Sequence, residues 1–378
     1  MRRLWIVIGL VAHVGLVARP AWTDGTRLSG AGDWSSYHYA VKAAAEGGDP
    51  YDVRALGDLA RAERTRRTVQ PYFYPPTFLL TVAWSLPLPL MTASNVAFVL
   101  NEGMLAAVFF LLWRMGAPAW GLALLAVFPP ITENLRLGQA NVATLLPIVL
   151  ALWSIERRGR AGGWLAGAAL LKMSPALLLA PFALQRRWRA FFGAMVVAGI
   201  GITLSFVLVR PAPQLRFWTE VLPGFFGGGW HGLQIPVVGP TNLSLAAEFA
   251  RLYPTRAIGL SETAAALSRG AGVALLVAWA LAARRVSVRD ALLGLTPLMV
   301  FLPTYTWEAH LVLLLPALAL LAGARPIVFV VLVALLGIPE AWRMPLLGQP
   351  GLATFAQLAK VGAGLVLAGV WVGRRRPQ

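Results

Sequence analysis

One carboxylate in the first polar stretch stands where it can either cap a helix or do chemistry. Asp33 precedes an amphipathic segment that ends at Gly47 and Gly48, so we predict a short helix that starts at this acid. The exposed amide groups of a helix start favour a carboxylate, and a solvated cap is one interpretation. The other is a general base that takes a proton from an attacking hydroxyl, which requires a carboxylate held in a cleft. The orientation of Asp33 decides between them.

Aromatic and amide side chains recur at the predicted ends of apolar segments. Tyr74 belongs to an aromatic cluster followed by Pro75 and Pro76, which forms either an interfacial belt or a groove that stacks on a sugar or a prenyl chain. Gln139 and Asn141 stand at the start of another apolar run. They either cap a helix or donate hydrogen bonds to sugar hydroxyls.

A second group of candidates combines cations with an imidazole and a carboxylate. Lys172 stands within the apolar segment 161–184, where a lysine is costly unless it faces polar groups, so it is a functional candidate. His310 is either a structural hydrogen-bonding group, a cation for a phosphate oxygen or a neutral group that orients a substrate. Glu308 is the second candidate base, and Arg136 is a further candidate partner for an anion.

The sequence contains no pattern typical of a bound metal or cofactor. A metal site needs several His, Asp or Glu residues at fixed spacing, and the chain has no cysteine. Neither a Walker-type loop nor a Rossmann fingerprint is present. We therefore expect neither a metal nor a cofactor.

Composition places the chain in the membrane. Hydrophobic residues make up 58% and charged residues only 13%, against about 25% charged in soluble domains, and the mean hydropathy is +0.66. The net charge of +17 comes mostly from arginine, as expected for inside-facing loops that fix topology. No basic soluble domain is present for nucleic-acid binding. We therefore expect a multi-pass protein whose environment is membrane lipid.

Apolar runs predict an all-α bundle with about 10–13 membrane segments in a single domain, 1–378. An uncleaved first span is favoured over a cleaved signal peptide. The candidate spans are Leu4–Trp22, Ser94–Trp113, Trp120–Ile131, Val142–Ile155, Ala190–Val209, Thr263–Ala283, Ala291–Leu302, His310–Leu321, Pro326–Ile338 and Ala353–Val372.

Arginine clusters predict which loops face inward. The clusters stand at 2–3, 157–160, 186–189, 284–289 and 374–376. This assignment places the stretches 23–74, 132–141, 210–262 and 303–309 outside, with 339–352 joining them. We expect short amphipathic helices in 23–74 and 210–262, and a cover over the site in the latter, which contains Trp218, Trp230 and His231.

Two segments do not fit simple spans. Segment 161–184 has arginine on both sides, so we expect a hairpin that enters and returns, with its tip between Lys172 and Pro175. Segment 75–91 contains four prolines and either fails to cross or crosses with a partner segment.

Taken in order, these motifs resemble glycosyltransferase family 87. The resemblance rests on Asp33 with Gly48-Asp49-Pro50-Tyr51, Tyr74-Pro75-Pro76, Gly138-Gln139-Ala140-Asn141, Lys172-Met173-Ser174-Pro175 and Glu308-Ala309-His310. It implies a GT-C helical bundle that moves a hexose, with mannose favoured by similarity to mycobacterial phosphatidylinositol mannoside mannosyltransferases, from a polyprenyl-phosphate donor. It also implies that Asp33 is the base and that His310 lies beside the donor phosphate.

These inferences predict an inverting single displacement onto a hydroxyl of a lipid or glycan acceptor. Lys172, His310 and Arg136 would contact the phosphate, and Tyr74, Gln139, Asn141 and Glu308 the sugar or lipid. We expect a monomer in the inner (plasma) membrane with an extracytoplasmic site. The alternatives are a flippase for a lipid-linked sugar and an oligosaccharide ligase with a lipid diphosphate donor, which would gather outer arginines such as Arg210 and Arg216.

Overall fold

The computed structural model describes residues 1–26, 32–65, 69–155, 159–227, 236–255, 258–343 and 350–374. Within these ranges every regular element is a helix. Trp230, His231 and the arginines at 66–67, 157–158 and 375–376 lie outside the described residues.

Five of the described helices are long and apolar enough to cross a bilayer. They occupy Arg2–Thr23, Leu90–Arg114, Trp188–Leu208, Glu262–Ala283 and Phe355–Val372. The first comprises α1 (Arg2–His13) continued by η1 (Val14–Ala18) and η2 (Ala21–Thr26), and the others are α5 (Leu90–Arg114), α11 (Trp188–Leu208), α15 (Glu262–Ala283) and α20 (Pro350–Val372).

Shorter helices fill the space between these long ones. The described apolar helices are α6 (Ala119–Leu125), α8 (Asn141–Trp153), α9 (Arg160–Leu171), η4 (Ser174–Leu179) with α10 (Ala180–Leu184), α16 (Val288–Phe301), η6 (Glu308–Leu314) with α17 (Leu315–Ala324), and α18 (Pro326–Leu336). The remaining short helices are α2 (Trp34–Ala45), α3 (Val53–Ala62), α4 (Pro76–Val82), η3 (Ala83–Ser85), α7 (Pro129–Leu137), α12 (Pro211–Arg216), η5 (Phe217–Val221), α13 (Leu222–Gly227), α14 (Leu245–Leu252) and α19 (Glu340–Arg343).

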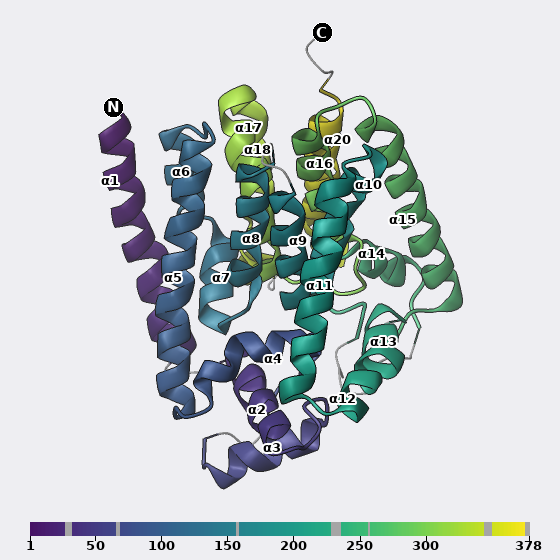
Figure 1. Cartoon of the computed structure of the whole chain (residues 1–378). Helices are drawn as coiled ribbons and strands as arrows, with labels where there is room; N and C mark the ends of the chain where they lie inside the picture. Colours follow the sequence, from purple (N-terminus) through teal and green to yellow (C-terminus); the bar gives the residue numbers. More distant parts are fainter. Residues whose placement is uncertain are drawn as a thin grey trace.

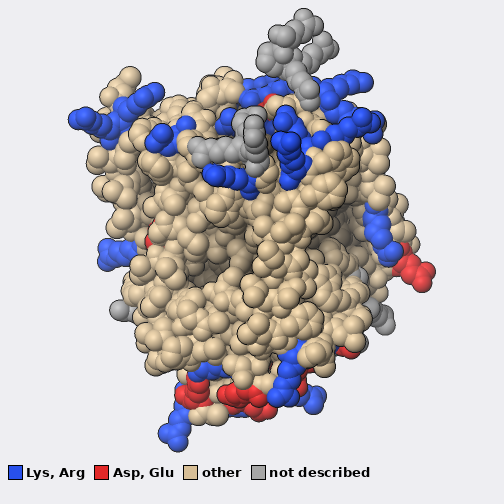
Figure 2. Space-filling model, viewed as in Figure 1, with Lys and Arg blue, Asp and Glu red and all other residues tan. Residues whose placement is uncertain are grey.

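The two ends of the bundle differ in shape and charge. Both termini lie at one end, and α2, α3, α12 and α13 lie at the other (Figure 1). On the face shown, Lys and Arg gather at the end with the termini, whereas the end with the short helices carries acids together with further Lys and Arg, and the surface between the two ends is mostly uncharged (Figure 2). This distribution matches the arginine-based prediction that the described clusters share one face.

Prolines and a local break in the backbone interrupt several of the apolar segments. The predicted span 120–131 is divided, because Pro129 and Pro130 end α6 and start α7. The hairpin breaks at Lys172, whose backbone is extended (φ −151°, ψ 129°), and the chain continues as η4. Segment 75–91 forms only α4 and η3 before α5 begins. At seven residues, α4 is too short to cross.

Helix α2 is not a surface helix. The sequence predicted a short amphipathic helix here, but ten of its twelve residues are buried, including the polar residues Ser35, Ser36 and His38. Helices α3 and α4 both pack against it, and Tyr37 contacts the rings of Tyr74 and Phe78. Because neighbouring helices pack against α2, they also fix the position of Asp33, which immediately precedes it.

Candidate active site

Asp33 occupies the N-cap position of α2, but its side chain does not cap the helix. Its backbone N–H donates to the carbonyl of Leu137 at 2.9 Å, and its Oδ2 accepts a hydrogen bond from Gln139 Nε2 at 2.7 Å. Gly32 has a φ of +49°, and a Cβ there would lie 2.8 Å from the Leu137 oxygen. The carboxylate is thus held against the end of α7 and does not point away into bulk solvent.

A chain of hydrogen bonds joins this carboxylate to the lysine of the hairpin. Gln139 Oε1 accepts from Asn141 Nδ2 at 2.7 Å, and Asn141 Oδ1 accepts from Lys172 Nζ at 2.7 Å. Asn141 Nδ2 also donates to the carbonyl of Ala309 at 3.2 Å. We call Asp33, Gln139, Asn141 and Lys172 the polar relay. It connects the start of α2, the start of α8 and the break after α9.

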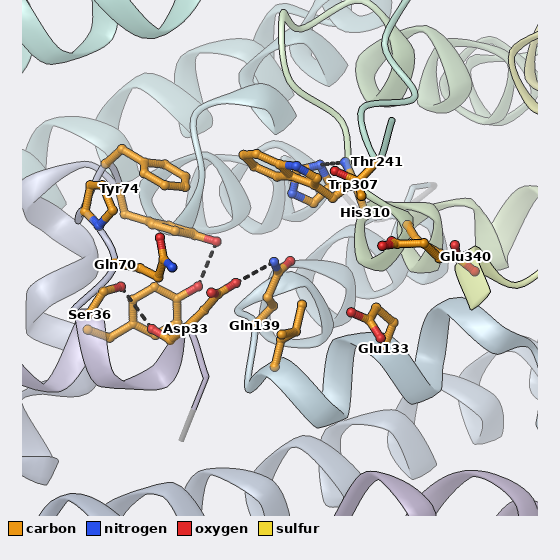
Figure 3. Close-up of a pocket in the computed structure, with 15 residues that line it drawn as sticks. Asp33, Ser36, Gln70, Tyr74, Glu133, Gln139, Thr241, Trp307, His310 and Glu340 are labelled. Atoms are coloured by element: carbon orange, nitrogen blue, oxygen red, sulfur yellow. Dashed lines mark hydrogen bonds between the residues drawn. The ribbon is translucent and has the colours of Figure 1, made fainter. Parts of the chain in front are cut away.

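Asp33 opens into a polar cavity of about 220 Å³. The described lining is Asp33, Ser36, Tyr37, Gln70, Pro71, Phe73, Tyr74, Glu133, Leu137, Gln139, Thr241, Trp307, Glu308, His310 and Glu340. Asp33 and Gln139 face one another on one side of it, while Glu133 and Glu340 lie on the other (Figure 3). The cavity therefore presents carboxylates, amides and aromatic rings, which are the groups that bind sugar hydroxyls and ring faces.

A larger apolar cavity of about 440 Å³ adjoins the polar one. Its lining comes mainly from η4, α13, α15, α16 and the segment 302–305, and includes Lys172 as its one cation among the described residues. Three residues line both cavities: Phe73, Tyr74 and His310. The Lys172 ammonium group lies 5.8 Å from the centroid of the Tyr74 ring. A polar chamber and an apolar chamber thus meet at these three side chains.

His310 is positioned by the turn that starts η6. Its backbone N–H donates to the carbonyl of Trp307 at 2.9 Å, and its Nδ1 accepts from the Trp307 N–H at 3.4 Å. With Nδ1 as the acceptor, the neutral ring carries its proton on Nε2. Glu308 lines the polar cavity and lies 3.7 Å from Lys360 Nζ, measured from its Oε2.

The loop before η6 is held by a buried asparagine from the second polar stretch. Asn242 Nδ2 donates to the carbonyls of Val237 and Thr304, and its Oδ1 accepts from the N–H groups of Ser244 and Thr306. Its side chain is fully buried, with every hydrogen-bonding position used. The Asn242 side chain thereby fixes the backbone of residues 304–306, which lead into the turn that carries His310.

Two of the candidate residues, Arg136 and Asn141, lie behind the cavity walls. Arg136 lines neither cavity, because its guanidinium binds Glu133 through Nε at 2.9 Å and Nη2 at 2.5 Å. Asn141 lines neither cavity, because its amide is used within the polar relay and on the Ala309 carbonyl. Each is hydrogen-bonded to residues that do line a cavity: Arg136 to Glu133, and Asn141 to Gln139 and Lys172.

The surroundings of Asp33 change its acidity. Burial raises the pKa of Asp33 above its ordinary value and outweighs the lowering effect of the hydrogen bond from Gln139. The charge of Glu133 also raises this pKa, whereas Arg136 and Lys172 lower it. A carboxylate with a raised pKa is a better proton acceptor, as a general base requires.

The comparison with known families follows this geometry. The sequence profile of glycosyltransferase family 87 matches residues 72–303, more than half of the chain. The chain belongs to glycosyltransferase family 87. It is therefore a multi-pass membrane glycosyltransferase that acts on a sugar donor and an acceptor. A search of curated proteins found no match.

The family match covers only part of the candidate site. It includes Tyr74, Arg136, Gln139, Asn141 and Lys172 and leaves out Asp33, Glu308 and His310. These three residues, which lie outside the matched range, all line the polar cavity together with matched residues such as Tyr74 and Gln139. Asp33 also accepts a hydrogen bond from Gln139.

Several residues at the site were not identified from the sequence. Gln70, Thr241 and Glu340 line the polar cavity, the first two from loops and Glu340 from the start of the short helix α19, and nothing in the sequence around them distinguishes them. Lys360 could have been identified from the sequence, because a lone lysine in the predicted span 353–372 is costly without a polar partner. Within the described residues, no group of three or more His, Cys, Asp or Glu is arranged to hold a metal ion.

Proposed function

We propose that the enzyme transfers a hexose, with mannose favoured by the family resemblance, from a polyprenyl-phosphate donor to a hydroxyl of a lipid or glycan acceptor. The observation that carries this proposal is the junction of the two cavities at Phe73, Tyr74 and His310. A prenyl chain suits the apolar chamber, and a sugar suits the polar one. A phosphate between them would lie near Lys172 and His310.

The proposed step is a single displacement at the anomeric carbon. Asp33 accepts the proton of the acceptor hydroxyl while that oxygen forms the new bond to carbon. The bond from carbon to the phosphate oxygen breaks, and the phosphate leaves with the electron pair. Lys172 and the Nε2–H of His310 offset the negative charge that develops on the phosphate. Attack from the opposite face inverts the configuration.

The distribution of arginines favours a monophosphate donor over a diphosphate. A diphosphate would be expected to gather cations, yet Arg136 binds Glu133, and Arg216 binds Asp49 and Glu220. Arg210 lies beside Gly47 and lines neither cavity. These contacts weigh against the oligosaccharide ligase interpretation.

The charge distribution supports an extracytoplasmic site in the inner (plasma) membrane. The polar cavity is lined by Asp33 and Ser36 from the start of α2, at the end of the bundle opposite the gathered Lys and Arg (Figure 2). Because basic loops stay inside, the site would face outward.

The base assignment is tested by Asp33→Asn in membranes supplied with polyprenyl-phosphate hexose. General-base catalysis contributes about 10²- to 10⁴-fold, and we expect the rate to fall by that factor. Asp52→Asn is the matched control, because Asp52 caps α3 through the N–H groups of Arg54 and Ala55, and asparagine also caps well. Near-normal transfer by Asp33→Asn would reject this base.

The donor class is tested by supplying the same sugar on a polyprenyl monophosphate or a polyprenyl diphosphate. We expect transfer of label from the monophosphate alone. Transfer from the diphosphate with none from the monophosphate would favour the ligase.

A further inference from the structure

Helix α20 contributes a buried cation that the proposed displacement does not use. Lys360 is fully buried, and its Nζ donates to the carbonyl of Leu336 at the end of α18 at 2.9 Å. The same nitrogen lies 3.7 Å from Glu308 Oε2, and only 3% of the Glu308 side chain is exposed. A buried ammonium group is unfavourable unless an opposite charge and hydrogen bonds compensate it. This lysine is therefore placed to compensate the charge of Glu308.

Glu308 connects Lys360 to the polar cavity. Glu308 lines the polar cavity from the first turn of η6, two residues before His310. Lys360 lines neither the polar nor the apolar cavity. Of the two described partners of Lys360, Glu308 and Leu336, only Glu308 lines the polar cavity, so we place the influence of Lys360 on that cavity at the Glu308 carboxylate.

The polar cavity and the apolar cavity differ in the charged side chains that line them. The described lining of the polar cavity contains four carboxylates, Asp33, Glu133, Glu308 and Glu340, and no lysine or arginine. The apolar cavity contains Lys172. Carboxylates accept hydrogen bonds from hydroxyl groups and repel a second anion. An anionic group is thus favoured only at the junction near Lys172, which the donor phosphate would occupy.

We propose that the polar cavity selects an acceptor whose sugar head presents hydroxyl groups and no acidic group, with Glu308 accepting hydrogen bonds from that head. Lys360 is the positioning residue that keeps the Glu308 carboxylate in place. This assignment rests on the proposed function, because it takes the polar cavity to receive the head of the acceptor next to the donor sugar. It adds the charge class of the acceptor and a role for a helix that lies beyond the family match.

The selectivity is tested with two acceptors that differ at one carbon. An n-octyl hexoside and the corresponding n-octyl hexuronide, which carries a carboxylate at C6, are offered to the wild-type enzyme with polyprenyl-phosphate hexose. We expect kcat/KM for the hexoside to exceed that for the hexuronide by roughly tenfold or more, as for one lost charge-assisted hydrogen bond. Equal use, or a preference for the hexuronide, overturns the selectivity and leaves the donor assignment intact. No use of the donor with either acceptor overturns the proposed function itself.

The roles of Glu308 and Lys360 are tested by Glu308→Gln and Lys360→Met. Each is expected to raise KM for the octyl hexoside by roughly 10- to 100-fold, with a smaller change in kcat, because hydrogen bonds to the head are weakened. Lys360→Arg should recover most of the loss, because it restores the cation. A purely structural role would lower the yield of folded enzyme without changing KM.

The matched control for Lys360→Met is Lys42→Met. Lys42 pairs with Glu63 and lines neither cavity, so its KM should stay at the wild-type value. If Lys360→Met does not fold, the test is carried by Glu308→Gln, which retains the volume of the native side chain, and by Lys360→Arg, which retains the positive charge. A wild-type KM in folded Lys360→Met, or in Glu308→Gln, overturns the proposal.

Discussion

The ammonium group of Lys172 donates a hydrogen bond to Oδ1 of Asn141 at 2.7 Å, and the amide of the same asparagine donates to Gln139. Asn141 is fully buried on the first turn of α8. Because a buried asparagine has few ways to satisfy both ends of its amide, these two bonds fix its orientation. The lysine near the donor side and the carboxylate on the acceptor side are therefore held by one shared set of bonds.

Asn141→Leu should lower transfer without preventing folding. Leucine keeps the branched shape of the asparagine side chain but leaves Lys172 without this acceptor and Gln139 without this donor. One hydrogen bond to a charged group contributes about 1.5–3 kcal/mol, so we expect kcat/KM to fall by roughly 10- to 100-fold. Thr144→Val is the matched control, because Thr144 is equally buried on α8 but bonds only the Ala140 carbonyl of its own helix. An Asn141→Leu enzyme as active as this control would show that the relay has no role in transfer.

Gln139→Leu should move the acidic limb of the pH–rate profile to higher pH. The hydrogen bond from Gln139 lowers the pKa of Asp33, which burial raises above its ordinary value, so losing this bond raises the pKa further. A base acts only when ionised, and activity will then be lost at a higher pH as the medium is acidified. A hydrogen bond to a charged group corresponds to a shift of about one pH unit or more.

The control for this profile is Gln185→Leu. Gln185 donates to the carbonyls of Ala283 and Val286, and it lines neither cavity. Its acidic limb should coincide with that of the wild type in kcat/KM measured across pH. If the limb of Gln139→Leu also stays in place, or moves to lower pH, Gln139 does not stabilise the ionised base.

Local signals in the sequence predicted the helices and the individual candidate residues, but not their partners. Apolar run length predicted the long helices, and the isolated lysine before Pro175 predicted the break at Lys172. Asp33 was predicted to start a helix, and it occupies the N-cap position of α2. A helix start does not determine which way a carboxylate that caps no N–H group points. Its partner, Gln139, is 106 residues away in the sequence.

Long-range packing explains what the sequence left open. Helix α2 was predicted only as an amphipathic helix, because its own residues do not reveal that α3, α4 and α5 pack against it. Whether segment 75–91 crosses the membrane could not be predicted from its own residues. In the structure α4 packs against α2 and α9, which are distant in the sequence or follow it. The pairing of Lys360 with Glu308 joins two different helices, which hydropathy alone cannot bring together.

Gly32→Ala should displace Asp33 and reduce transfer. The φ of Gly32 is +49°, which costs an alanine about 1–2 kcal/mol, and its Cβ would lie 2.8 Å from the oxygen of Leu137. Relief of this contact must move the segment away from α7 and lengthen the bond from Asp33 to Gln139. We expect a fall of at least about tenfold in kcat, measured with saturating donor and acceptor.

Gly103→Ala is the matched control for this substitution. Gly103 lies within α5, and a Cβ there meets nothing within 4 Å. Alanine should leave the rate unchanged and slightly favour the helix. Equal rates for the two alanine variants would mean that the close approach of Gly32 to Leu137 does not position the base.

His13→Ala should loosen the first helix without changing the chemistry. Pro130 has no N–H for the carbonyl of Ala126 at the end of α6, and His13 Nδ1 lies 2.7 Å from that oxygen. His13 Nε2 lies 3.0 Å from Glu102 Oε2 on α5, so one side chain joins three helices. Losing these bonds should lower the free energy of unfolding by about 1–3 kcal/mol, which a thermal melt in detergent will detect.

Val14→Ala provides the comparison for this melt. Val14 is the next residue and is 54% exposed, so its truncation should cost little, because it removes mainly contacts with the surrounding lipid or detergent. Neither His13 nor Glu102 lines the polar or the apolar cavity of the site. The specific activity of folded His13→Ala enzyme should therefore match the wild type at temperatures well below its melting point. A large loss of activity in folded protein, with an unchanged melting temperature, would instead couple this helix to the site.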